Sequence, residues 1–145
     1  NMVDINYMAK WLADRIIEID RIMEGKLPSI AILVNSEEEI QPLANAMNDC
    51  LEDNNINVTP CSKGGVGSEN GVRIFSIEYI KGLEFEAVFF INVDVLAKEK
   101  PEIFDKYIYV GASRAATFLG LTCSSKQLPD KLQPLSHLFT DNWMD

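Results

Sequence analysis

The sequence is poor in the residues that build metal centres and disulfide frameworks. It contains one histidine, His137, and three cysteines. The cysteines, Cys50, Cys61 and Cys123, are odd in number and too far apart to form a CxxC pair. We therefore expect neither a bound metal nor a set of structural disulfides.

The sequence also lacks long apolar runs and an excess of positive charge. No stretch reaches the roughly 18 consecutive apolar residues of a transmembrane helix, and the N-terminus lacks the basic and then apolar order of a secretory signal. We therefore expect a cytoplasmic protein that does not enter a membrane. Its 13 lysines and arginines are outnumbered by 22 aspartates and glutamates, which gives a net charge of −9. That charge opposes attraction to phosphates, so the chain alone should bind nucleic acid poorly.

The residues that are abundant predict one globular domain with helices. The 145 residues are 47% hydrophobic, which is enough for a single core. From Ile5 to Met23, apolar residues recur at steps of three and four, the spacing of one helix face. A second such pattern follows, and Ser36 with Glu39 resembles a capping box ahead of it. We expect its regular part to start near Pro42, because proline inside a helix removes a hydrogen bond and clashes with the preceding turn.

Short apolar runs between the helical patterns predict the strands of a sheet. These runs are residues 30–34, 56–61, 72–77, 87–93 and 118–123. A third helix is expected from Glu102 to about Ala115, entered through Pro101. Strands that alternate with helices specify a parallel, doubly wound α/β sheet, in which ligands lie at the carboxyl ends of the strands.

Two short motifs stand out against this regular pattern. The segment KGLEFEAVFF (81–90) is followed some twenty residues later by YVGASRA (109–115). In this order the pair resembles the fifth and sixth conserved motifs of superfamily 1 helicases of the UvrD/Rep type, KGLEFxxV and YVAxTRA. The resemblance covers roughly residues 5–123.

The resemblance implies a fold, an activity and a set of partners. Residues 1–123 are expected to form the second RecA-like domain of an ATP-dependent DNA helicase, as part of a longer protein, with 124–145 as a C-terminal extension. This domain would be a three-layer relative of the P-loop NTPases without a phosphate loop of its own. The implied partners are the N-terminal RecA-like domain of the same protein and single-stranded DNA. The implied cofactor is ATP with Mg²⁺, shared with that first domain.

By the resemblance, the first motif contacts the nucleotide. Glu84 is expected to hydrogen-bond the ribose, with Lys81 and the Gly82 backbone near the phosphates. A cation suits phosphate oxygens and a carboxylate suits sugar hydroxyls, so the residue types agree with these roles. The alternative is a solvated tight turn, in which Gly82 supplies a positive φ.

The second motif supplies the candidate catalytic residue. The resemblance makes Arg114 an arginine finger that touches the γ-phosphate held by the other domain. Such a finger stabilises charge that develops during phosphoryl transfer, and its effect on the rate is about 10³ to 10⁵. The alternative is an arginine near a helix C-terminus, which the helix dipole favours by about 0.3 to 1 kcal/mol.

Contacts to DNA are the least specific part of the resemblance. Ser76 and Tyr79 are candidate contacts to the strand, although a serine in a strand is usually structural. The family's histidine, three residues before the motif lysine, is replaced by Glu78, which repels a phosphate. The residues alone leave two other functions open: a RecA-like binding module that needs no nucleotide, and a subunit that supplies its arginine to a separate ATPase. A shared fold does not separate these classes.

The isolated chain is expected to hydrolyse no ATP and to bind it only weakly. Its motifs supply ribose and γ-phosphate contacts, but the glycine-rich stretch KGGVGSENG (63–71) is not followed by the GK[ST] of a phosphate loop. Calorimetric titration with ATP and Mg²⁺ measures the affinity, and a phosphate-release assay measures turnover. A micromolar affinity or steady turnover by the purified chain contradicts the interpretation as half of an ATP site.

Overall fold

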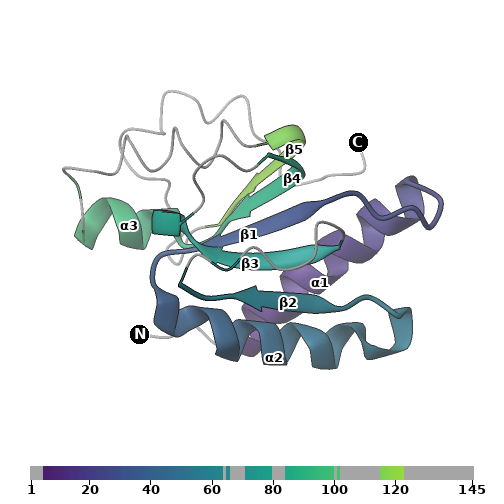
Figure 1. Ribbon diagram of the computed structural model, residues 1–145, viewed down its shortest axis with the longest axis horizontal. Coiled ribbons are helices and arrows are strands. Elements are labelled where there is room, and N and C mark those ends of the chain that lie inside the picture. Colours follow the sequence, from purple (N-terminus) through teal and green to yellow (C-terminus); the bar gives the residue numbers. More distant parts are fainter. Residues whose placement is uncertain are drawn as a thin grey trace.

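The chain forms a five-stranded sheet in which every neighbouring pair is parallel, in the order β2-β3-β1-β4-β5 (Figure 1). This computed structural model describes residues 5–63, 65, 71–79, 84–99, 101 and 115–122. The strands are β1 (Ile30–Val34), β2 (Val58–Cys61), β3 (Val72–Ser76), β4 (Phe85–Phe90) and β5 (Ala115–Leu121). The predicted parallel α/β sheet is confirmed.

Three α-helices and three short 3-10 turns are described between the strands. They are α1 (Ile5–Ile22), α2 (Ile40–Leu51), α3 (Val93–Glu99), η1 (Glu37–Glu39), η2 (Glu52–Asn54) and η3 (Ile77–Tyr79). Among the described residues no helix is long and apolar enough to cross a membrane. The expected C-terminal extension, 124–145, lies outside the described residues.

Helix α1 forms where the apolar period predicted it. Its inner stripe is fully buried and includes Leu12, Ile16 and Ile19. The helix ends where Gly25 takes a left-handed φ of 82° and its amide donates a 2.9 Å hydrogen bond to the Asp20 carbonyl. A glycine at this position ends a helix without steric cost, because it has no Cβ.

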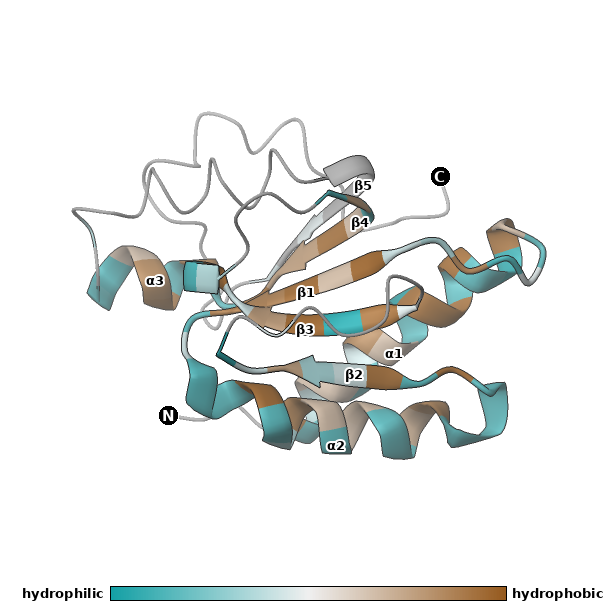
Figure 2. Cartoon of the chain, viewed as in Figure 1, coloured by the Kyte–Doolittle hydropathy of each residue, from teal (hydrophilic) through white to brown (hydrophobic). Residues whose placement is uncertain are grey.

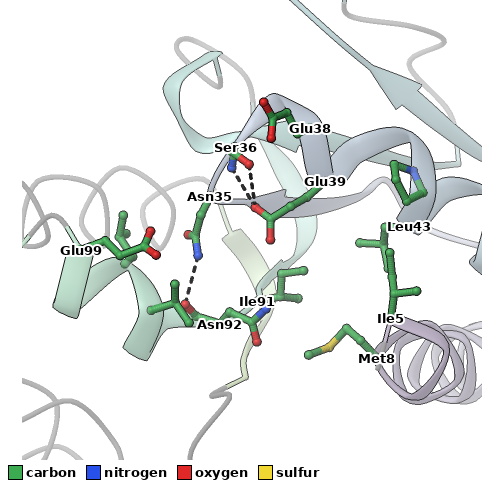
Figure 3. Close-up of a pocket in the computed structure, with 13 residues that line it drawn as sticks. Ile5, Met8, Asn35, Ser36, Glu38, Glu39, Leu43, Ile91, Asn92 and Glu99 are labelled. Atoms are coloured by element: carbon green, nitrogen blue, oxygen red, sulfur yellow. Dashed lines mark hydrogen bonds between the residues drawn. The ribbon is translucent and has the colours of Figure 1, made fainter. Parts of the chain in front are cut away.

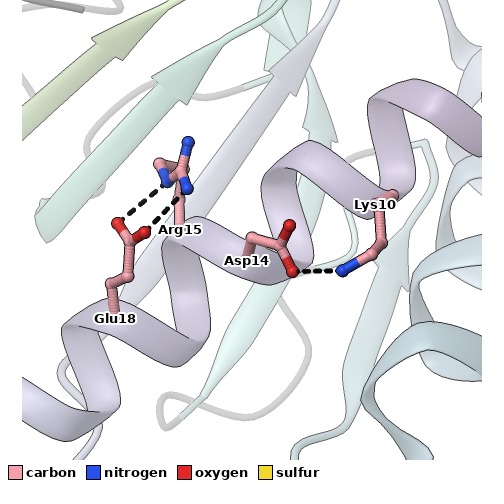
Figure 4. A network of polar contacts seen from close by, with 4 residues as sticks. All are labelled: Lys10, Asp14, Arg15 and Glu18. Atoms are coloured by element: carbon pink, nitrogen blue, oxygen red, sulfur yellow. Dashed lines mark hydrogen bonds and ion pairs between the residues drawn. The ribbon is translucent and has the colours of Figure 1, made fainter. Parts of the chain in front are cut away.

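The outer face of α1 carries two ion pairs along the helix (Figure 4). Lys10 Nζ lies 2.6 Å from Asp14 Oδ1, and the Arg15 guanidinium donates to both carboxylate oxygens of Glu18, at 2.7 and 2.9 Å. Side chains three and four positions apart on a helix are neighbours, so both pairs follow from the sequence spacing. The helix therefore turns one face to the sheet and the other to water.

Helix α2 begins earlier than the sequence predicted. It starts at Ile40, two residues before Pro42, and the 3-10 turn η1 leads into it. The first turn of a helix has no intrahelical acceptors for its amides, so a proline there removes nothing. The expected capping box is confirmed, with the Ser36 amide donating to the Glu39 carboxylate at 2.9 Å.

The boundaries around β4 and β5 also differ from the prediction. Val93, predicted at the end of a strand, is the first residue of α3, because Asn92 adopts a left-handed φ of 53° that ends the extended chain. Ala115, predicted at the end of a helix, is the first residue of β5. The rest of that predicted helix, 102–114, lies outside the described residues.

The two faces of the sheet pack against different parts of the chain. One face joins α1 and α2 in a single apolar cluster. The central strands β1 and β4 are coloured mostly as hydrophobic in Figure 2. The sheet residues in that cluster are Ile30, Ile32, Val34, Val72, Ile74, Ala87, Phe89 and Ile91. Alternate residues point to the opposite face, where Leu33, Phe75 and Phe90 are buried outside this cluster. That opposite face also holds Arg73, which is only 5% exposed.

Leu12→Ala is expected to lower the free energy of unfolding by about 2 to 5 kcal/mol, because it leaves a cavity at a fully buried position of the core. Lys10→Ala, on the outer face of the same helix, should change stability by less than about 0.5 kcal/mol. Urea unfolding followed by circular dichroism measures both. Similar effects for the two variants would mean that α1 does not pack as described.

Candidate functional site

The described part of the nucleotide motif lies at the amino end of β4. Glu84 is exposed and directly precedes Phe85, the first residue of that strand. Phe85 is paired with Ala115, the first residue of β5, which directly follows Arg114 in the sequence. The sheet therefore aligns the residue after Glu84 with the residue after Arg114. Glu84 therefore lies at the amino end of β4, whereas the sequence predicted ligands at the carboxyl ends of the strands.

Ser29 fixes the position of this strand end relative to β1. Its hydroxyl accepts a 3.1 Å hydrogen bond from the Glu86 amide, and its carbonyl accepts one of 3.1 Å from the Ala87 amide. Just here the pairing of β4 with β5 is irregular, since Phe85 pairs with Ala115 but Ala87 pairs with Phe118. Such irregularities re-aim a side chain next to a site and commonly accompany function. The backbone around Glu84 is thus held from two neighbouring strands.

The other predicted nucleotide residues are not described. Lys81, Gly82 and Arg114 lie outside the described residues, so their roles stay predictions. Glu84 alone of the four has a described position. Its exposure at a strand end is compatible with a contact to a ligand hydroxyl.

The two predicted DNA contacts lie at the opposite end of the sheet. Ser76 is the last residue of β3 and is fully buried, with its hydroxyl accepting a long, 3.5 Å hydrogen bond from the Glu78 amide. This geometry favours a structural role for the Ser76 hydroxyl. Tyr79, at the end of η3, is 44% exposed beside the exposed Glu78. DNA contact by either residue stays a prediction.

A pocket of about 480 Å³ opens beyond the carboxyl ends of β1 and β4 (Figure 3). Sequence reasoning did not identify it as a site. Its lining comes from α1, the β1–α2 connection, the first turn of α2, the β4–α3 connection and α3. The lining residues are Ile5, Met8, Asn35, Ser36, Glu38, Glu39, Pro42, Leu43, Ile91, Asn92, Val95, Leu96 and Glu99.

Two asparagines tie the strands together at the base of this pocket. Asn35 directly follows β1, and its side-chain amide donates a 3.1 Å hydrogen bond to the carbonyl of Asn92, which follows β4. The Asn92 amide in turn donates to the Thr122 hydroxyl after β5, at 2.9 Å. The only signal for these residues in the sequence is that each follows an apolar run, where asparagine is also an ordinary turn residue.

The described residues that line the pocket are apolar side chains, polar side chains and carboxylates, and none of them is basic. Glu39 is already engaged in capping the Ser36 amide, and acidic residues at the start of a helix are favoured by its dipole. No group of three or more potential metal-ligating side chains is found among the described residues. The arrangement is explained by helix capping and strand-end hydrogen bonds, and it does not suit a phosphate.

Cys61, the last residue of β2, is 2% exposed. Burial raises the pKa of its thiol, while the nearby Arg73 cation acts in the opposite direction. Cys50, on α2, is exposed. The two thiols therefore differ strongly in their access to solvent.

Comparison with known proteins supports the resemblance seen in the sequence. Residues 71–127 match the family model of the UvrD-like helicase C-terminal domain, a stretch that contains both motifs. The fold is similar to the crystal structure of the C-terminal domain of a possible DNA helicase from Lactobacillus plantarum WCFS1, with a TM-score of 0.63 and 22% identity over 87% of this chain and 74% of that one. The predicted resemblance and the RecA-like fold are thus confirmed. No curated protein matched the chain.

Iodoacetamide at pH 8 is expected to alkylate Cys50 much faster than Cys61. The thiolate is the reactive form, and burial both blocks access to Cys61 and raises its pKa. Peptide mass spectrometry over a time course measures the two rates separately, and unfolding in urea should equalise them. Equal alkylation rates for the two cysteines in the native protein would contradict the burial of Cys61 at the end of β2.

Proposed function

We propose that this chain is the C-terminal motor domain of an ATP-dependent superfamily 1 DNA helicase. The observation that carries the proposal is the pairing of Phe85 with Ala115. It brings the ends of the two motifs, KGLEF and YVGASRA, to neighbouring positions on one edge of the sheet. The two segments, whose last residues are about thirty positions apart in the sequence, thereby become candidates for one site.

The chemistry of these segments fits the ribose and phosphate end of a nucleotide. Glu84 is an exposed carboxylate and accepts hydrogen bonds from ribose hydroxyls. Lys81 and the Gly82 amide contact phosphate oxygens, and Arg114 reaches the γ-phosphate. ATP with Mg²⁺ would supply the free energy for movement, and the first motor domain would hold its phosphates, because this chain has no phosphate loop.

The proposed reaction is ATP hydrolysis at the interface of two RecA-like domains. Arg114, as an arginine finger, stabilises the negative charge that develops on the transferred phosphoryl group. Glu84 orients the nucleotide through the sugar and contributes mainly to binding. Half of the site belongs to each domain, so the two domains must close on the nucleotide for turnover.

The DNA track is proposed at the carboxyl end of β3, where Tyr79 is exposed and able to stack on a base. The phosphate contacts must come largely from the first motor domain. The net charge of −9 and the exposed Glu78 make this domain alone a poor partner for a phosphate backbone.

In the protein that contains both motor domains, Arg114→Ala is expected to lower DNA-stimulated ATP turnover by at least about a hundredfold. The lost interaction belongs to the transition state, so nucleotide binding should weaken much less than turnover falls. Arg114→Lys should rescue little, since an ammonium lacks the planar fork that holds two phosphate oxygens. Steady-state ATPase assays and nucleotide titration measure the two effects.

Arg21→Ala is the matched control for this variant. Arg21 is an exposed arginine in the last turn of α1, where it interacts favourably with the helix dipole. This is the structural role that the alternative interpretation gives to Arg114. Arg21→Ala should leave ATP turnover unchanged and change the free energy of unfolding by less than about 1 kcal/mol. If Arg114→Ala behaves like this control, Arg114 is structural and the helicase proposal loses its catalytic residue.

A further inference from the structure

A buried arginine lies beside the proposed nucleotide site and takes no part in the function described so far. Arg73, in the middle of β3, is 5% exposed, although its neighbours in the strand are buried apolar residues. A buried cation costs several kcal/mol in lost hydration, and apolar replacements of similar volume are often as stable or more stable. The core alone therefore gives little reason for an arginine here.

The Arg73 guanidinium contacts two aromatic rings that also contact each other. Its Cζ lies 4.7 Å from the ring centroid of Phe85 and 5.5 Å from that of Phe75. The two rings are themselves 5.6 Å apart and inclined at 54°. Both distances are within the range of cation–π attraction, which is stronger when the cation is desolvated, and Arg presents a flat face that matches a ring. The three side chains form one compact cluster, which we call the Arg73 cluster.

The Arg73 cluster joins β3 to a strand that is not its neighbour. In the sheet β1 lies between β3 and β4, so the contact of Arg73 and Phe75 with Phe85 passes across β1. Phe85 has the same parity as Ala87 and Phe89, which face α1 and α2, yet it packs with the Arg73 cluster and is absent from their core. The ladder between β1 and β4 begins only at Ala87, so pairing with β1 does not set the direction of the Phe85 side chain.

We propose that Arg73 is a positioning residue that orients the Glu84 carboxylate toward the ribose of the nucleotide. Phe85 directly follows Glu84, and consecutive Cα atoms are about 3.8 Å apart, so the direction of Phe85 limits where the Glu84 side chain can point. The Arg73 cluster fixes the Phe85 ring, and Ser29 fixes the backbone at Glu86 and Ala87. The inference rests on the proposed function, since it takes Glu84 as the ribose contact.

The test uses the protein with both motor domains and compares two nucleotides, ATP and 2′,3′-dideoxy-ATP, which lacks the hydroxyls that Glu84 would bind. Glu84→Ala should raise KM for ATP about tenfold or more and leave KM for the dideoxy nucleotide unchanged, because that contact is already missing. Arg73→Met replaces the guanidinium by an apolar side chain of similar length. It should raise KM for ATP about three- to tenfold and leave KM for the dideoxy nucleotide unchanged. The kcat should change little in either variant, because a ribose contact is made equally in the ground state and the transition state.

Two further variants separate positioning from a structural role. Arg73→Lys keeps the charge but loses the flat guanidinium. Its KM for ATP should therefore lie between that of the unchanged protein and that of Arg73→Met, and its KM for the dideoxy nucleotide should be unchanged. Arg15→Met is the matched control, because Arg15 also stacks on an aromatic ring, that of Trp11 at 5.2 Å, but does so on α1. It should leave KM for both nucleotides unchanged. If Arg73→Met does not fold, as judged by its thermal midpoint, Phe85→Leu removes the stacked ring instead and should show the same selectivity.

The outcomes distinguish failure of the inference from failure of the proposed function. If Glu84→Ala does not distinguish the two nucleotides, the ribose contact itself is wrong and the proposed site falls with it. If Glu84→Ala distinguishes them but Arg73→Met leaves both KM values unchanged, or raises both equally, then Arg73 does not position Glu84. A selective rise for ATP in both variants supports the positioning role.

Discussion

The pairing of β4 with β5 at their first residues is the constraint on which the candidate site depends. Phe85 and Ala115 lie opposite each other, so the sheet brings together two segments that carry the proposed nucleotide contacts. A parallel pair cannot be joined by a tight turn and needs a long crossover, which explains why the two motifs are far apart in the sequence.

The two ends of the sheet are built for different tasks. At the amino end, Ser29 and the irregular pairing at Phe85 hold the backbone next to an exposed carboxylate. At the carboxyl end, the side chains of Asn35 and Thr122 hydrogen-bond the backbone of Asn92 and so join β1, β4 and β5, and a pocket lined by apolar residues and carboxylates lies beside them. This separation departs from the usual rule that open α/β sheets bind ligands beyond the carboxyl ends of their strands. Here Glu84, the proposed ribose contact, lies at the amino end of β4, and the predicted DNA contacts, Ser76 and Tyr79, lie at or near the carboxyl end of β3.

Burial also separates residues that the sequence treats alike. Ser76 and Tyr79 were equal candidates for DNA contact, yet one is fully buried and the other is 44% exposed. Cys50 and Cys61 are both unpaired cysteines, but only the second is covered by the sheet and held with a raised pKa. Arg73 looks like an ordinary polar position in a strand, and its contact with two rings depends on β3 and β4, which are not neighbours in the sheet. In each case the difference comes from packing across elements, which local patterns do not record.

The sequence by itself determined the class of fold, most of its elements and the family resemblance. Uninterrupted apolar runs such as Ile30–Val34 form buried parallel strands because both faces are covered, and the three-to-four spacing of α1 leaves it one buried face. The start of α2 was misplaced because Pro42 is harmless in a first turn, and the end of β4 because Asn92 turns left-handed. Only the tertiary structure decided which strand ends meet, which face Phe85 takes and what surrounds Arg73. Those depend on register and on contacts across three strands, and the free energy of such contacts is set by burial and geometry in the folded molecule and not by any short stretch of residues.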